Sequence, residues 1–350
     1  MAAPRYPDVL PLTLRELRDA EPELIGSEEL SQQQYGAAVD RLALDSTNFP
    51  RFPWPDLAAA AGPMCPEDVV MVMARTGGGK SLFLQNLFDA LVTTGRTGLY
   101  VGLEQSPEIL RLKWACLRAG VDPRLMLAPT PEERATLDWR EARARVNGEL
   151  AWQRTPAVKE RAMFAPARTI NARQLGEWTR WAVDHRADFL VLDHIDRVKH
   201  GEGRNPFHEM SETMRLAKEL AVEHQLVMLI ASQVGRPGDA NEAFIPPALH
   251  NARGGGTKEE ESDLVLGIYR PLKPEVTEAD MKRVRQGFTG PDAIMEPNQM
   301  GVRVLKHRLD GSAVGKVARL AVHHGRVAHL PARHLYETTQ EALHRMGRPA

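Results

Sequence analysis

The chain has 350 residues and a formal net charge of −1, with 43% hydrophobic and 26% charged residues, which is the composition of an ordinary soluble protein of one or two domains. It has no apolar run of the roughly 18 residues that a membrane span needs. Its N-terminus lacks the basic start and apolar block of a secretory signal. Its two cysteines are far apart, which excludes a disulfide framework and a CxxC metal site. We therefore expect a cytoplasmic protein without a membrane partner, whereas nucleic acid stays open because a ring or channel needs positive charge only where it meets the polymer.

The first part of the chain is polar and mixed, and we expect an arm or linker with short helices over residues 1–55. The stretch 48–68, with its five prolines, is typical of a linker that feeds a domain. The main domain is then expected over 56–335 and a tail over 336–350.

A regular alternation of strands and helices follows the linker. Apolar runs predict strands at 68–74, 97–104, 188–196, 226–233 and 262–270. Helical spacing of apolar residues, with capping residues, predicts helices at 80–95, 106–120, 172–186 and 206–224, and an arginine-rich helical segment at 132–163. Alternation at 302–309 and 317–324 predicts a terminal hairpin, and the polar segment 271–300 interrupts the strand pattern as an insertion or loop. The fold class is therefore α/β, a mostly parallel twisted sheet with helices on both faces and a C-terminal β-hairpin.

A glycine-rich loop, ARTGGGKS at 74–81, directly follows one apolar strand and directly precedes a helix. Its glycines let consecutive N–H groups face one anion, as in phosphate-binding loops, with Lys80 at the β- and γ-phosphates and the Ser81 hydroxyl on Mg²⁺. Ala74 stands where the general pattern has glycine, yet the strand, the helix and the G-K-S order favour a nucleotide site over a chance glycine-rich turn. The predicted nucleotide-binding residues are Ala74, Arg75, Thr76, Gly77, Gly78, Gly79, Lys80 and Ser81.

Polar side chains also end three of the predicted strands, where a parallel sheet opens its ligand crevice. Asp193 ends FLVLD and predicts the acid that holds the water shell of Mg²⁺, with Asp196 as the weaker alternative. Glu104 can orient and deprotonate an attacking water, and Gln233, at the end of LVMLIASQ, can sense the γ-phosphate. ATP and Mg²⁺ are therefore the expected cofactors.

In this order the motifs resemble the C-terminal motor domain of DnaB-type replicative helicases, over about residues 60 to 330. ARTGGGKS matches the A-R-P opening of that family's loop except at Thr76. GLEQS corresponds to the segment that carries the family's catalytic glutamate. LDHID stands for its metal-side aspartate segment, with His194 in place of a tyrosine. The strand ending SQ stands for its γ-phosphate sensor, and KHRLDG for its K-x-R-x-G segment.

The resemblance implies a RecA-like P-loop NTPase with Glu104 as catalytic base and Gln233 as sensor. It further implies that Arg308 is an arginine finger, with Lys306 as its companion, acting on the ATP of a neighbouring subunit. Such a homo-oligomer would be a hexameric ring that translocates on single-stranded DNA and unwinds duplex during replication. Residues 1–55 are too short for the helical domain with which that family docks primase, so we expect a phage, plasmid or accessory helicase whose loader or primase partner stays open.

The loops that follow Asp193 and Gln233 would face the central channel in this family. Their glycines would let backbone N–H groups approach phosphates, and the near absence of aromatic residues favours backbone contacts over base stacking. The predicted contacts to a single-stranded backbone are Arg204, Arg236, Arg253 and Lys258.

Two other interpretations stay open. A RecA-like ATPase without helicase activity, such as a recombinase-type filament or a regulatory ring, would share the ATP site, although the K-H-R segment argues for the helicase. An assembly protein that binds ATP only for structure would need neither Glu104 nor Lys80.

Overall fold

The computed structural model describes residues 49–166, 170–199, 206–234, 247–249, 257–270 and 298–330. Its strands are β1 (Val69–Ala74), β2 (Gly98–Gly102), β3 (Ala162–Phe164), β4 (Phe189–Asp193), β5 (Val227–Gln233), β6 (Leu264–Tyr269), β7 (Gln299–His307), β8 (Val317–His323) and β9 (Arg326–His329). They form one sheet in the order β3-β2-β4-β5-β1-β6-β7-β8-β9. The strands from β3 to β6 in this order are parallel, and β7, β8 and β9 are antiparallel, so the mostly parallel sheet and the C-terminal hairpin are confirmed.

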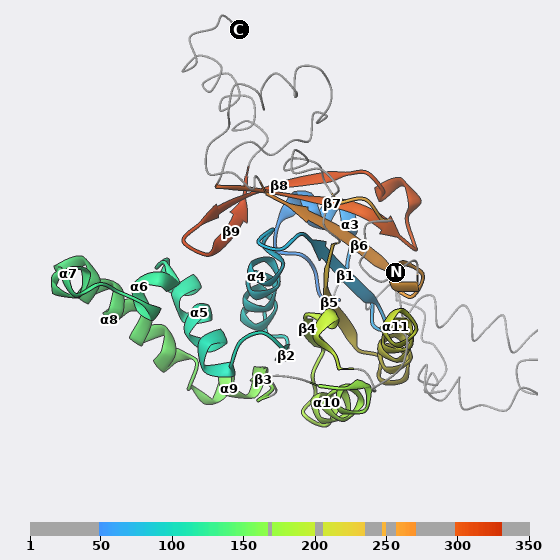
Figure 1. Cartoon of the computed structure of the whole chain (residues 1–350), viewed down its shortest axis with the longest axis horizontal. Coiled ribbons are helices and arrows are strands. Elements are labelled where there is room, and N and C mark those ends of the chain that lie inside the picture. The colour runs from blue at the N-terminus through green and yellow to red at the C-terminus, as the bar shows by residue number, and fades with distance from the viewer. Residues whose placement is uncertain are drawn as a thin grey trace, which may run out of the picture. The chain divides into compact units, whose positions relative to one another are not determined.

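Helices cover both faces of this sheet, as predicted (Figure 1). They are α3 (Pro55–Ala61), α4 (Lys80–Thr93), α5 (Pro107–Ala119), α6 (Pro123–Leu127), α7 (Pro131–Ala135), α8 (Leu137–Trp152), α9 (Pro156–Arg161), α10 (Ala172–Asp184), α11 (Pro206–His224) and α12 (Thr257–Glu260). On one face α3 and α4 pack against Val70 and Val72 of β1, and on the other α10 and α11 pack against Val69 of β1 and Leu190 of β4. Strands covered on both sides read as continuous apolar runs, which is why VVMVMA is buried along its whole length.

The helices that flank the site begin and end where their sequences indicate. Ser106 caps α5 by accepting a hydrogen bond from the N–H of Ile109, Pro107 takes the first helical position, and Gly120 ends the helix in the left-handed conformation. The arginine-rich segment 132–163 is not one helix. It is divided among α7, α8 and α9, and its last residues form the short edge strand β3.

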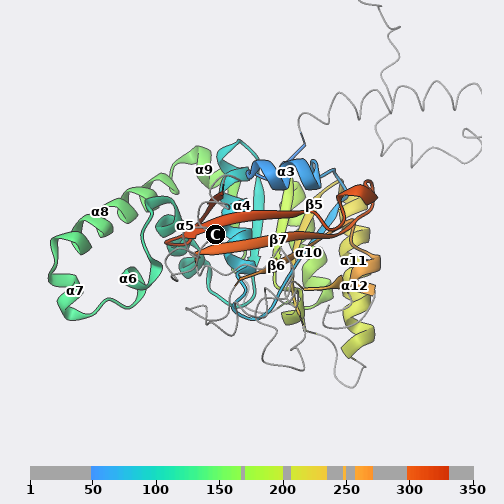
Figure 2. The same ribbon diagram turned by 90° about the horizontal axis from the view of Figure 1, so that it is seen from above.

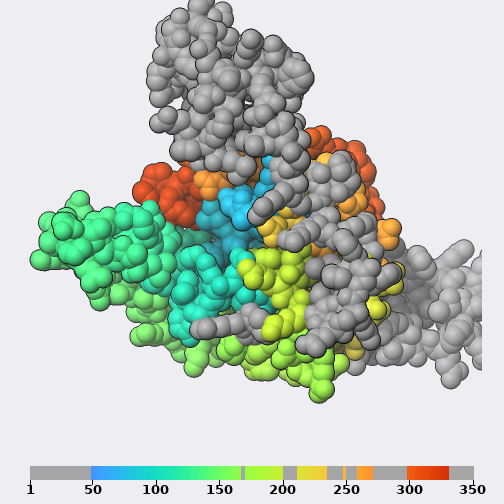
Figure 3. All heavy atoms as spheres, viewed as in Figure 1, coloured from blue at the N-terminus to red at the C-terminus, as the bar shows by residue number. Residues whose placement is uncertain are grey.

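The helices α6, α7 and α8 stand at one side of the sheet, whereas α11 lies at the other, as two perpendicular views agree (Figures 1 and 2). Figure 2 shows α12 beside α11. In the space-filling view the green part of the chain forms a lobe at that first side (Figure 3). This lobe is joined to the sheet through α5, whose Ala115 and Cys116 pack against Ala142 and Val146 of α8. Among the described residues, none of the helices is both long and apolar enough to cross a bilayer.

The proline-rich stretch 48–68 does more than link. Phe52, Trp54 and Leu57 are buried in the core beside α4, and the ring of Trp54 stacks on Phe83. The prolines are compatible with this packing because Pro55 takes the first position of α3. The packed polypeptide thus begins before residue 56, while residues 1–48 and 331–350 lie outside the described residues.

Candidate functional site

Four neighbouring strands, β2, β4, β5 and β1, carry the predicted site at their carboxyl ends. Gly102 pairs with Asp193 across β2 and β4, and Ala74 pairs with Gln233 across β1 and β5. Glu104 lies two residues beyond Gly102, and the glycine-rich loop begins directly after Ala74. Parallel pairing therefore brings this loop, Glu104, Asp193 and Gln233 to one edge of the sheet, where ligands bind in open α/β folds.

The loop between β1 and α4 has a conformation that needs its glycines. Gly77 and Gly79 have φ values of 76° and 100°, in the region that favours glycine. A Cβ atom on Gly79 would also lie 2.6 Å from Cε of Met300. Since α4 begins at Lys80, the loop delivers the N-terminus of a 14-residue helix to the site, and such a terminus favours an anion.

Lys80 lies in the field of three carboxylates. Burial lowers its pKa, and the charges of Asp193, Asp196 and Glu104 act in the opposite direction. The pKa stays below the ordinary value for lysine. The ammonium group of Lys80 is partly buried at the start of α4. A polyanionic ligand suits this position, because its phosphate oxygens can form charge-assisted hydrogen bonds with the ammonium.

Asp193 presents one oxygen atom that has no partner among the described residues. Its Oδ2 accepts a hydrogen bond of 2.8 Å from the hydroxyl of Tyr100, while its Oδ1 is buried and unpaired. Buried acceptors are normally satisfied, so an unpaired carboxylate oxygen indicates a missing cation or water. Carboxylate and hydroxyl oxygens, such as those of Asp193 and of Ser81 in the first turn of α4, are ligands that Mg²⁺ accepts.

Glu104 is a half-exposed carboxylate held from two sides. Its Oε1 lies 3.2 Å from Nε2 of His194 and accepts a hydrogen bond of 3.2 Å from Nη2 of Arg197. Burial raises the pKa of this carboxyl, but the contacts with His194 and Arg197 outweigh it and hold the pKa below its ordinary value. Glu104 is therefore ionised at neutral pH, as a general base must be.

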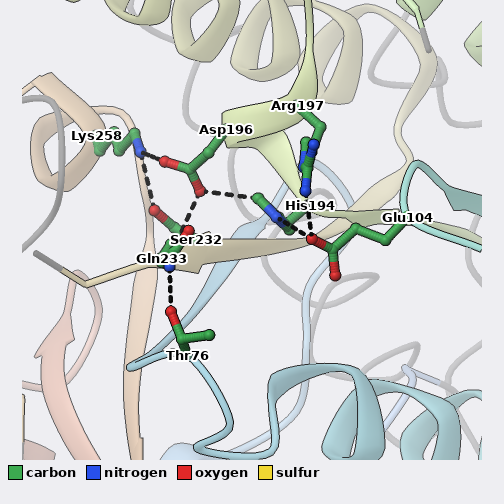
Figure 4. A network of polar contacts seen from close by, with 8 residues as sticks. All are labelled: Thr76, Glu104, His194, Asp196, Arg197, Ser232, Gln233 and Lys258. Carbon is green, nitrogen blue, oxygen red and sulfur yellow. Dashed lines mark hydrogen bonds and ion pairs between the residues drawn. The ribbon is translucent and has the colours of Figure 1, made fainter.

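Asp196, unlike Asp193, is fully engaged (Figure 4). Its Oδ2 accepts a hydrogen bond of 2.8 Å from the backbone N–H of Gln233 and lies 3.1 Å from Nδ1 of His194. Its Oδ1 accepts a hydrogen bond of 2.8 Å from Nζ of Lys258. With both oxygens occupied, Asp196 has less capacity for a metal ion, so the geometry favours Asp193 for that role.

Lys258 does not have the place that we predicted. Its side chain is 1% exposed, and its Nζ contacts Asp196 and, at 2.9 Å, Oγ of Ser232. An ammonium group buried in an ion pair is not offered to a DNA phosphate, so the predicted nucleic-acid contact of Lys258 is wrong. The other predicted contacts, Arg204, Arg236 and Arg253, lie outside the described residues.

Arg308 and Lys306 lie at the opposite edge of the sheet. Arg308 donates from its backbone N–H to the carbonyl of Asp263 at 2.8 Å and forms an ion pair of 2.6 Å with Oδ1 of the same residue. Lys306 donates to the carbonyls of Glu259 and Glu260. Asp263 is bonded to Val69, at the amino end of β1, whereas the glycine-rich loop follows the carboxyl end. The structure thus separates these two cations from the site of their own chain.

Several side chains near the site were missed in the sequence. Thr76 was expected at the nucleotide, but not its contact with β5: it accepts a hydrogen bond from Nε2 of Gln233, which ties Gln233 to the loop. Arg270 follows β6 and approaches the loop, since a Cβ atom on Gly79 would lie 3.5 Å from its Cδ. Lys113 of α5 lies in the field of Asp193 and Glu104. Arg270 carried a local signal, because it is a charged residue at the end of the predicted strand 262–270. Lys113 did not, because it lies inside an ordinary amphipathic helix.

Comparison with known proteins decides the family. The model of the DnaB-like helicase C-terminal domain matches residues 54–320. The chain belongs to this family. A replicative DNA helicase DnaB from Rickettsia typhi is 25% identical over 218 residues, which cover 58% of this chain and 41% of the relative, and that from Rickettsia prowazekii is equally similar. The chain therefore spans less than half the length of these curated relatives.

Solved structures show the same fold for the DnaB-like domain. One is described as a DnaB-like replicative helicase and its interactions with primase; it has a TM-score of 0.60 and 15% identity, over 77% of this chain and 58% of that one. The other is described as an ATPase domain, with a TM-score of 0.59 and 16% identity, over 76% of this chain and 86% of that one. The predicted RecA-like fold is confirmed.

Proposed function

We propose that this DnaB-like chain is the motor of a ring-forming DNA helicase, which hydrolyses ATP to translocate on single-stranded DNA and unwind duplex during replication. The observation that carries the proposal is the common edge of β2, β4, β5 and β1, where Glu104, Asp193, Gln233 and the glycine-rich loop meet. Membership of the DnaB-like family supports the same activity.

In the proposed reaction the glycine-rich loop and Lys80 bind the phosphates of ATP. Glu104, ionised at neutral pH, takes a proton from the water that attacks the γ-phosphorus, while the bond from that phosphorus to the β–γ bridging oxygen breaks and ADP leaves. Gln233 hydrogen-bonds the γ-phosphate. Ser81 and Asp193 would hold Mg²⁺, which supplies positive charge to the β- and γ-phosphates when bound. Asp193 suits this role because its buried Oδ1 has no other partner among the described residues.

The charge that develops on the γ-phosphate needs a further cation, and we propose that Arg308 of an adjacent copy supplies it, with Lys306 beside it. The distance of Arg308 from its own loop supports action between copies, in a hexameric ring whose seams hold ATP. The near-neutral net charge is compatible with a channel that carries positive charge only on its inner surface.

Phosphate release and strand displacement on a forked duplex test this function together. We expect ATP hydrolysis that single-stranded DNA stimulates, unwinding that requires ATP, and a loss of about 10²–10⁴ in hydrolysis for Glu104→Gln. Hydrolysis without unwinding would favour a RecA-like ATPase of another kind. Equal turnover in the parent and Glu104→Gln would contradict the proposed catalytic base.

A further inference from the structure

A path of polar contacts joins Glu104 to a buried lysine, Lys258. From Glu104 it passes through His194 to Asp196 and ends at Lys258 (Figure 4). The residues come from distant parts of the chain, since Asp196 belongs to a 3-10 helix after β4, Lys258 to α12, and Glu104 to the segment that follows β2. Contacts over sequence separations of 90 and 62 residues make this a tertiary network.

The ion pair between Lys258 and Asp196, at the end of this path of contacts, need not add to the stability of the fold. The side chains of Lys258 and Asp196 are 1% and 8% exposed, so both charges are removed from water. Such a pair often contributes no more to stability than apolar residues of similar volume, because desolvation offsets the attraction. Its value lies in geometry, since each buried charge must keep the partners that satisfy it.

Asp196 is the branch point of the network. Burial raises its pKa, but His194, Lys258 and the N–H of Gln233 lower it to about 2, so the carboxylate is ionised throughout the physiological range. One oxygen fixes the backbone of Gln233, and the same oxygen meets His194, whose other ring nitrogen meets Glu104. Lys258 holds the second oxygen and also binds Ser232, the residue before Gln233.

We propose that Lys258 and Asp196 are a positioning pair that sets Glu104, through His194, and Gln233, through its backbone, in the arrangement required for hydrolysis. The proposal rests on the proposed ATP hydrolysis at this site. Neither side chain is among the residues proposed to contact ATP, and the pair acts on Lys80 and Gln233 only indirectly. Its loss should therefore slow the chemical step more than it weakens nucleotide binding.

The test uses the full chain and separates hydrolysis from binding. Single-turnover hydrolysis of ATP is measured beside the Kd of a fluorescent ATP analogue, for the parent and for Asp196→Asn combined with Lys258→Met. The double variant removes both charges and so leaves no lone buried ion. We expect the hydrolysis rate to fall by about tenfold to a hundredfold, the scale of a misplaced catalytic group, with Kd within about threefold of the parent.

Arg118→Met is the matched control. Arg118 of α5 forms ion pairs with Asp89 and Glu149 away from the network, so its loss should leave the hydrolysis rate unchanged. If the double variant does not fold, as judged by its urea unfolding curve, His194→Phe decides by breaking the same path in the middle, and we expect the same separation of rate from Kd.

The outcomes are distinct. If the double variant or His194→Phe folds and hydrolyses ATP at the parental rate, while Glu104→Gln hydrolyses it slowly, the positioning pair alone is overturned. If the parent does not hydrolyse ATP, or if Glu104→Gln hydrolyses it at the same rate as the parent, the proposed function is overturned and the positioning pair with it. An equal loss in Arg118→Met also overturns the pair, because the effect would then be general.

Discussion

Mixing two inactive variants tests whether the ATP site is shared between copies of the chain. Arg308 is bonded to Asp263, level with Val69 at the amino end of β1, and the glycine-rich loop follows Ala74 at the other end. At about 3.3 Å per residue the strand separates the two ends by about 17 Å, far beyond the reach of one side chain. Arg308 therefore does not reach the loop of its own chain, and on the proposed shared site we expect Arg308→Ala to lower hydrolysis by about 10³–10⁵.

The recovery in a mixture with Glu104→Gln follows from counting seams. In a head-to-tail ring each seam joins the Glu104 side of one copy to the Arg308 side of the next. After random assembly at equal amounts, half of the seams keep Glu104 and half of these face an intact Arg308, so about one quarter are complete. The mixture should hydrolyse ATP at about a quarter of the parental rate, although each variant alone is nearly inactive.

The assay is phosphate release after the two variants are dissociated, mixed and reassembled. The control mixture replaces Glu104→Gln by a chain that carries both substitutions, which leaves no complete seam at any ratio. Recovery in the first mixture and not in the second is the expected result. A first mixture that stays at the level of the separate variants, in a parent whose specific activity is also independent of concentration, would refute a shared site.

Three further predictions concern the parts of one copy. Gly79→Ala should weaken binding of a fluorescent ATP analogue by about tenfold, because φ is 100°, a backbone strain of about 1–3 kcal/mol for an L side chain, whereas the flexible end of Met300 can move aside. Gly148→Ala, in open space on α8, should instead stabilise the fold by about 0.5–1 kcal/mol. Tyr100→Phe should lower the free energy of unfolding by about 1.5–3 kcal/mol in urea titrations, since it deletes a buried hydrogen bond to a carboxylate; an unchanged midpoint would contradict that bond. The pKa of Asp68 is raised from 3.8 to about 6, by burial foremost and by Asp263, against the hydrogen bond from Cys65 and the charges of Lys218 and His307. The parent should therefore lose about 3 kcal/mol relative to Asp68→Asn as the pH rises from below 4 through 6, and a pH-independent difference would contradict the raised pKa.

The edge of the sheet that carries the site could be predicted because the sequence features that indicate it lie within short segments. An apolar run that stops at a polar residue marks the end of a buried strand, and alternation with helices makes the strands parallel, so Asp193 and Gln233 had to share an edge. The glycine-rich loop could be predicted for a similar reason. A φ value such as that of Gly79 is accessible to glycine and to few other residues, so the glycines indicate this conformation.

What the sequence did not reveal depends on partners that are distant in the chain. Lys258 precedes a run of glutamates, and such a charged segment after a glycine-rich loop is normally solvated. Its burial is decided by Asp196, 62 residues away, and by Ser232, neither of which has a spacing that announces the contact. Thr76 likewise looked like a neutral replacement until β5 brought Gln233 beside it.

The two aspartates after β4 show why the assignment of roles needs the tertiary structure. Asp193 and Asp196 are the same residue type, three positions apart, and either could serve a metal ion by sequence alone. Tyr100 occupies one oxygen of Asp193 and leaves the other buried and unpaired among the described residues, whereas Lys258, His194 and Gln233 occupy both oxygens of Asp196. A buried oxygen without a partner favours a ligand, and a carboxylate with contacts on both oxygens has less capacity for one. The proposed division between metal binding and positioning would therefore arise from packing around two equivalent groups, and on that proposal replacing Asp196 and Lys258 together should lower the reaction rate more than it weakens nucleotide binding.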